Sequence, residues 1–289
     1  MIPLFIQFVD IHMLDRMNST NVHVPKYKDL IQSLVKILRD DCIYVTVSQD
    51  DQGITQRLHQ LRPNILVLSA GGYGHIPIPL IKGELPYQSP RSFHNFSLDI
   101  SFLGNTRPLL SRSGMLMELE ACIRETNTHL QRHGSFLRSD QKSKGGLRYY
   151  AGKHNRWQQL IEASKFSLAP RGFGRTSFRV AEIIQLGRLP VYMYDDHSWL
   201  PYGQSNISVT AFSFSGRMQQ LYRVVDSVLR VNSSQLKERL DQVKKARKFY
   251  TYEGVLQQID LFFRDPLGPN GGYLRCQRVP DRDHFDDFS

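Results

Sequence analysis

The sequence predicts an α/β fold built from two successive doubly wound units. Compact apolar runs alternate with stretches of helical spacing, this alternation occurs in two series, and a proline-rich segment at 77–91 separates the series. Strands that alternate with helices indicate parallel sheets with helices on their faces. Ligands of such sheets bind outside the carboxyl ends of the strands.

The first unit is expected to span residues 1–90. Its strands are predicted at 2–9, 43–47 and 65–68, and its helices at 24–38 and 53–61. Prolines 77, 79, 86 and 90 exclude a helix interior or a central strand. This segment is therefore predicted to connect two domains, 1–90 and 91–289.

The second unit repeats the alternation over a longer stretch. Strands are predicted at 98–103, 166–168 and 188–194, and helices at 113–124, 153–164, 177–186, 221–229, 235–249 and 255–263. The polar and basic segment 131–148 is predicted to be a loop, and 169–176 a glycine-rich loop.

Composition narrows the class of protein. With 40% apolar and 22% charged residues over 289 positions, the chain is neither disordered, nor collagen, nor a coiled coil. A formal net charge of +10 predicts an anionic partner, whether nucleic acid, a phosphate-bearing small molecule, an acidic polysaccharide or a lipid surface. Three widely spaced cysteines form neither a zinc motif nor a disulfide framework, and the count leaves room for one bridge.

The sequence shows neither a membrane-spanning segment nor a secretory signal. No apolar run approaches ~18 residues, and the N-terminus does not read as a secretory signal. The chain as written is therefore expected to be soluble and cytoplasmic, with membrane association only if an anchor is missing from this sequence.

The segment 164–202 carries the chemistry. A predicted strand ends at Pro170, a loop with Gly172 and Gly174 follows, and a helix opens near Ser177. Such a loop presents backbone N–H groups and the positive end of the helix dipole, which favours an anion. Arg171, Arg175 and Arg179 surround it, and guanidinium groups bind phosphate oxygens in a planar fork.

Glu182 lies three residues after Arg179, so both project from the same side of the first helical turns. The rest of this helix is apolar almost all round, which indicates a buried element. A carboxylate there can accept hydrogen bonds from ribose hydroxyls, as in dinucleotide folds. The alternative is a solvated Arg179–Glu182 ion pair beside a plain strand-to-helix turn.

This segment resembles the signature of the exostosin family, glycosyltransferase family 47. The positions that match in register are Ser164, Phe166, Leu168, Pro170, Gly172, Ser177, Arg179, Glu182, Gly187, Pro190 and Val191. Leu200-Pro201 also matches, and Ile100–Gly104 with Arg107 is similar to the strand that opens the family's second half. The resemblance covers about residues 95–205.

The resemblance implies a GT-B fold, with two Rossmann-like doubly wound domains facing a cleft, and transfer of a hexose or pentose from a nucleotide sugar, commonly UDP-linked, to a glycan or glycoprotein acceptor. It implies a Golgi location, inversion at the sugar carbon, and no metal or other cofactor. In the nucleotide-sugar site, Glu182 would hold the ribose, and Arg171 and Arg179 the diphosphate. Gly172 and Ser177 belong to the same site, and we add Arg175 from its place in the loop.

Several other residues could have either a structural or a functional role. Candidate catalytic bases are Asp10 and His12 after the first strand, and His75 after the glycine turn 71–74. That turn is expected to be a tight strand-to-helix connection, with a substrate loop as the alternative. Trp199 packs in the core or stacks on a sugar or uracil ring. Asp195-Asp196, the nearest approach to a metal-binding DxD, is either a turn or a functional pair.

Two further functions stay open at this point. An inactive exostosin-like subunit would bind a sugar or a partner enzyme without turnover. A nucleic-acid-binding protein would need aromatic residues interleaved with basic ones on an open surface. The basic residues are instead dispersed, apart from those at the glycine loop, so we expect no nucleic-acid partner.

Overall fold

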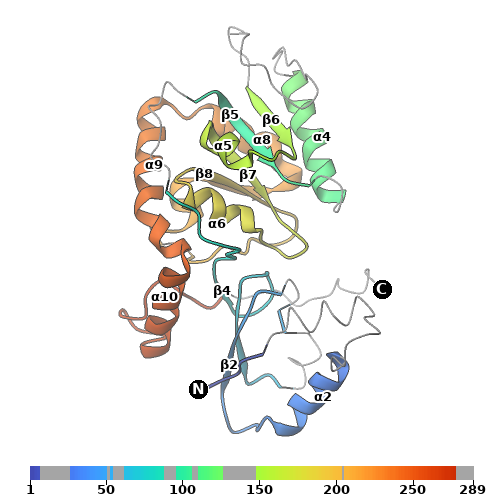
Figure 1. Cartoon of the computed structure of the whole chain (residues 1–289), viewed down its shortest axis with the longest axis vertical. Helices are drawn as coiled ribbons and strands as arrows, with labels where there is room; N and C mark the ends of the chain where they lie inside the picture. Colours follow the sequence, from blue (N-terminus) through green and yellow to red (C-terminus); the bar gives the residue numbers. More distant parts are fainter. Residues whose placement is uncertain are drawn as a thin grey trace.

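The computed structural model describes residues 1–6, 27–50, 53–54, 62–87, 96–105, 110–125, 148–203 and 205–277. These residues form two parallel β-sheets with helices around them, one sheet lying beyond the other along the long axis of Figure 1. The predicted α/β class is therefore confirmed. Asp10 and His12 lie outside the described residues.

The first sheet has four parallel strands in sequence order, β1 (Ile2–Pro3), β2 (Tyr44–Ser48), β3 (Ile65–Ser69) and β4 (Ile76–Pro77). Helix α2 (Tyr27–Ile37) places Ile31 and Leu34 against Tyr44 and Ile65 in a buried apolar cluster. The strands predicted at 43–47 and 65–68 are confirmed to within one residue. The helix predicted at 53–61 and the end of the strand predicted at 2–9 fall largely outside the described residues.

The glycine turn 71–74 does not lead into a helix, as the sequence suggested, but into the two-residue strand β4. Backbone hydrogen bonds fix this geometry: His75 N–H donates to the Val67 carbonyl at 2.9 Å and Ile78 N–H to Ser69 at 3.1 Å. Pro77 then sits in the edge strand of the sheet, where a missing N–H costs no ladder bond.

The second sheet has five parallel strands in the order β6-β5-β7-β8-β9. Their bounds are Leu98–Leu103 (β5), Tyr149–Gly152 (β6), Ser164–Pro170 (β7), Leu189–Tyr194 (β8) and Phe214–Arg217 (β9). Strand β7 lies in the middle, hydrogen-bonded to β5 and β8, and six of its seven residues are buried. The edge strands β6 and β9 were not predicted.

Helices cover both faces of this sheet. The helices that follow the connecting segment are α4 (Leu110–Glu125), α5 (Trp157–Glu162), α6 (Phe178–Gln185), α7 (Val209–Phe212), α8 (Leu221–Leu229), α9 (Ser233–Ala246) and α10 (Tyr252–Arg264), with short 3₁₀ turns at Met218–Gln220 and Arg247–Tyr250. Of these, α10 packs on the 3₁₀ turn Arg247–Tyr250. Among the described residues, no helix is both long and apolar enough to cross a membrane.

The winding direction reverses between β5 and β7. The chain leaves β5 through α4 toward β6 and leaves β7 through α6 toward β8, on the opposite side of the sheet. Because such crossovers are right-handed, α5 and α6 cover one face while α4 packs with α8 on the other (Figure 1). The carboxyl ends of β5 and β7 therefore form a topological switch point, where open α/β sheets bind ligands.

Specific polar contacts join the segments around β4 to later parts of the chain. Leu85 N–H donates to Gln185 Oε1 at 3.0 Å, and Arg247 Nη2 donates to the Leu85 carbonyl at 2.9 Å. At the far end of the described chain, Gln277 N–H donates to the His75 carbonyl at 2.7 Å. Buried apolar residues of β3 and β4, Leu68 and Ile76, belong to the same cluster as those of β5 and β7. The division into domains at residue 90 stays a prediction.

The start of α6 gives a first test of the fold. Ser177 is its N-cap, in extended backbone, and its hydroxyl accepts the Arg179 N–H. Ser177→Ala removes that acceptor and is expected to lower the free energy of unfolding by about 1 kcal/mol. Urea unfolding of the wild type, Ser177→Ala and Ser177→Thr measures this. Threonine keeps the oxygen, so equal losses in both variants would assign the effect to packing instead of capping.

Candidate functional site

The candidate site lies at the switch point, around the loop 171–177 that joins β7 to α6. Gly172 N–H donates to the Thr176 carbonyl at 2.7 Å, which closes the loop on itself. A Cβ at Gly172 would come within 3.2 Å of that carbonyl oxygen. The loop therefore turns tightly enough to require little or no side chain at this position.

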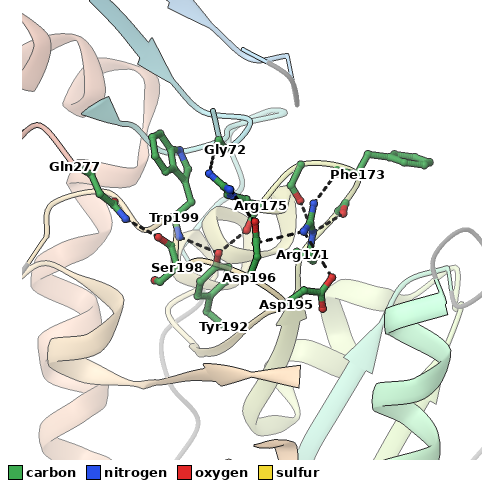
Figure 2. Close-up of polar contacts among 12 residues, drawn as sticks. Gly72, Arg171, Phe173, Arg175, Tyr192, Asp195, Asp196, Ser198, Trp199 and Gln277 are labelled. Carbon is green, nitrogen blue, oxygen red and sulfur yellow. Dashed lines mark hydrogen bonds and ion pairs between the residues drawn. The ribbon is translucent and has the colours of Figure 1, made fainter. Parts of the chain in front are cut away.

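Arg171 holds the loop from inside. Its Nε donates to the Gly174 carbonyl at 3.0 Å and its Nη2 to the Phe173 carbonyl at 2.9 Å. Its Nη1 lies 3.6 Å from Asp195 Oδ2 and 3.5 Å from Asp196 Oδ1. Figure 2 shows the guanidinium turned into the loop, with the Phe173 ring pointing away from it. Arg171 is thus engaged by its own loop and by two carboxylates.

Arg175 is nearly fully buried, with 5% of its surface exposed. Its Nε and Nη2 each lie 2.8 Å from Asp196 Oδ2, and its Nη1 donates to the Gly72 carbonyl of the first unit at 3.4 Å. The guanidinium carbon lies 4.2 Å from the centre of the Tyr73 ring. Arg175 therefore links the loop to the first sheet.

Asp196 supplies the counter-charge for this link. Burial alone would raise its pKa, but the hydrogen bond and charge of Arg175, the His197 backbone N–H and the charge of Arg171 outweigh burial and hold the pKa below its ordinary value. Asp195 and Asp196 thus form ion pairs with the loop arginines Arg171 and Arg175. Within the described ranges, no group of three or more histidine, cysteine or acidic side chains could hold a metal ion.

Trp199 lies at the same contact between the loop and the first unit, which we call the joint. It is 1% exposed, and its indole Nε1 donates to the Ser69 carbonyl at 3.0 Å. Its backbone N–H donates to the Tyr192 hydroxyl at 3.1 Å, and that hydroxyl donates to the Arg175 carbonyl. Of the two interpretations of Trp199, the contacts therefore give core packing between the sheets (Figure 2).

Arg179 and Glu182 form an ion pair on α6, with 2.8 Å between Arg179 Nη1 and Glu182 Oε2. The guanidinium carbon lies 4.3 Å from the centre of the Trp157 ring at the start of α5. Burial lowers the pKa of Arg179, and the Glu182 charge partly offsets this. With side chains 21% and 14% exposed, the pair is not a fully solvated one.

Sequence reasoning missed Arg112. It comes from the first turn of α4, and its Nε donates to the Arg171 carbonyl at 2.9 Å while its Nη1 donates to the Asn105 carbonyl at 3.2 Å. It therefore bridges the segments that follow β7 and β5. The available signal was a basic residue soon after the strand at 98–103, since helix starts that follow parallel strands gather at one edge of the sheet.

Of the candidate bases, His75 lies within the described residues, and its side chain is half-buried beside β3. Val67 N–H donates to its Nδ1 at 2.9 Å. An Nδ1 that accepts a hydrogen bond leaves the proton of the neutral ring on Nε2. In this geometry the Nε2–H of His75 is a hydrogen-bond donor. To act as a base through Nε2, the ring would have to carry its proton on Nδ1 and lose the hydrogen bond from Val67 N–H.

No protein-family model matches the chain, and no curated protein matches it.

Removal of the Asp196 charge tests the joint. Asp196→Asn leaves the buried Arg175 guanidinium without its counter-ion and is expected to lower the free energy of unfolding at pH 7 by about 1.5–3 kcal/mol. Asp195→Asn, the comparison variant, is expected to cost less than Asp196→Asn because the 3.6 Å contact of Asp195 with Arg171 is longer than the 2.8 Å contact of Asp196 with Arg175.

The shifted pKa of Asp196 predicts that its contribution to the free energy of unfolding depends on pH. The folded-state pKa of Asp196 lies below its unfolded value, so its stabilisation is present above about pH 4 and is lost as the pH falls through the folded-state pKa. Urea unfolding of the wild type and of Asp196→Asn should therefore converge in acid. Parallel curves down to pH 2 would show that the charge of Asp196 does not stabilise the fold.

Proposed function

We propose that this protein is a glycosyltransferase that moves a sugar from a nucleotide sugar, UDP-linked by resemblance, to a hydroxyl of a glycan or glycoprotein. Its two parallel-sheet units then act as the two Rossmann-like halves of a GT-B enzyme, with the donor on the second unit. The Golgi is the expected location by the same resemblance.

One observation carries the proposal. The glycine-rich loop, the start of α6 and the Arg179–Glu182 pair all lie at the switch point between β5 and β7. Helix starts and arginines at such a point suit the diphosphate of a nucleotide. Gly172, Ser177, Arg179 and Glu182 of this region are among the positions that carry the resemblance to the exostosin family.

The pair on α6 is suited to two parts of one donor. Trp157 supports the Arg179 guanidinium from one side, so the charge is held in place before a ligand arrives. A ribose hydroxyl that donates to Glu182 and a phosphate oxygen that accepts from Arg179 would use both ends of the pair. Donor binding then keeps each charge in contact with a polar partner, which limits the cost of desolvation.

The proposed reaction breaks the bond between the sugar carbon and the diphosphate oxygen, while the acceptor oxygen bonds to the carbon and loses its proton to a base. Negative charge grows on the leaving diphosphate, and preorganised guanidinium and N–H donors lower the barrier by stabilising that charge. The base is expected from the first unit, with Asp10 and His75 as candidates. No metal or other cofactor enters this scheme, and the nucleotide sugar is a co-substrate.

Substitution of the α6 carboxylate tests the proposal. Glu182→Gln keeps the size of the side chain and removes its charge, and it is expected to lower kcat/KM for release of nucleoside diphosphate by about 10- to 100-fold, the range for a lost hydrogen bond to a charged group. Asp226→Asn is the matched control, because Asp226 pairs with Arg230 on the exposed side of α8. It is expected to have wild-type activity.

A panel of nucleotide sugars supplies the substrates, with thermal shift as a parallel readout of binding. Release of diphosphate by the wild type supports glycosyl transfer, and full activity of Glu182→Gln would remove Glu182 from the site. A thermal shift without turnover would instead assign the inactive, sugar-binding subunit. Binding of nucleic acid with a steep salt dependence, and of no nucleotide sugar, would favour the nucleic-acid-binding alternative.

A further inference from the structure

The arginines at the switch point differ in how far their charges are neutralised. Arg171 lies near Asp195 and Asp196, Arg175 is bonded to Asp196, and Arg179 is paired with Glu182. Arg112 makes no ion pair with any residue that the structure describes. The positive charge that remains available at this edge therefore centres on Arg112.

The contacts of Arg112 leave part of its guanidinium free for a ligand. Its two hydrogen bonds, from Nε and Nη1, go to the neutral backbone carbonyls of Arg171 and Asn105. For Nη2, no hydrogen bond to the described part of the chain is found, and this atom lies 3.8 Å from the place of a Cβ on Gly172. Because residue 172 is glycine, no side chain at this position covers this end of the guanidinium.

The surroundings favour an added anion. Burial lowers the pKa of Arg112, and the neighbouring charges of Arg179 and Arg171 lower it further. Like charges held this close repel one another, so a phosphate between them gains attraction from each and relieves the repulsion. The sequence between Asn105 and Leu110 contains no acidic residue.

We propose that Arg112 binds the diphosphate of the donor, while Arg171 and Arg175 fix the loop and the joint between the sheets. This inference rests on the proposed function for the identity of the ligand. The sequence resemblance assigned the diphosphate to Arg171 and Arg179; this proposal keeps the phosphate contact of Arg179 and replaces Arg171 with Arg112. Arg112 reaches the same ligand from α4, across the switch point.

The experiment measures binding of three probes by calorimetry: UDP, inorganic pyrophosphate and uridine. Arg112→Gln is expected to weaken UDP binding by about 10- to 100-fold and to remove pyrophosphate binding, because a charge-assisted contact is lost. Uridine carries no phosphate, so its affinity should be unchanged. Arg112→Lys keeps a positive charge and should restore part of the affinity for pyrophosphate.

Controls separate binding from folding. Arg264→Gln removes an arginine from an exposed ion pair on α10 and is expected to bind all three probes as the wild type does. If Arg112 only supports the loop, Arg112→Gln will lower the melting temperature and weaken UDP and uridine binding alike, which overturns the proposal. Unchanged pyrophosphate binding by a folded Arg112→Gln overturns it too.

The two proposals fail in different ways. If the wild type binds pyrophosphate through Arg112 but releases no diphosphate from any nucleotide sugar, the anion site stands and glycosyl transfer falls. If the wild type turns over a nucleotide sugar and Arg112→Gln does so with unchanged KM, glycosyl transfer stands and the role of Arg112 falls. A wild type that binds neither UDP nor pyrophosphate overturns both.

Discussion

The burial of Arg175 constrains most of what surrounds the candidate site. A guanidinium that is 5% exposed is stable only with a counter-ion and hydrogen-bond partners, and Asp196 supplies the counter-ion. Arg175 follows β7 and Asp196 follows β8, so the loop 171–177 must curl over the ends of both strands to bring them together (Figure 2). That path fixes where α6 begins, and with it the positions of Arg179 and Glu182.

Arg175 also determines which residues fit at the joint with the first unit. Gly72 has φ of +129°, and a Cβ there would lie 2.5 Å from Arg175 N, so only glycine allows this approach. The Gly72 and Ser69 carbonyls accept hydrogen bonds from Arg175 and from the Trp199 indole. Because these acceptors belong to the backbone of β3 and of the turn that follows it, Arg175 and Trp199 connect the second unit to the first through specific hydrogen bonds.

The sequence predicted those parts of the fold and site that depend on local pattern. Apolar runs located β5 to the residue, and the glycine loop located the start of α6 within one residue. Strands β6 and β9 escaped because four residues at a sheet edge carry no distinctive period. The partners of Arg171 and Arg175 escaped because they depend on the register of β7 with β8, which pairs Pro170 with Met193, and register is a tertiary property.

The sequence pattern also could not show which carboxylates lie near the arginines of the loop. Arg171, Arg175 and Arg179 all lie near carboxylates, which limits the repulsion among buried like charges while no ligand is bound. Arg112, 59 residues before Arg171, adds a charge with no acid beside it among the described residues. Arg171 and Arg175 therefore hold backbone carbonyls of the loop and of the first unit, whereas the proposed role of Arg112 is to contact the ligand. On that proposal, stability and ligand binding depend on different arginines.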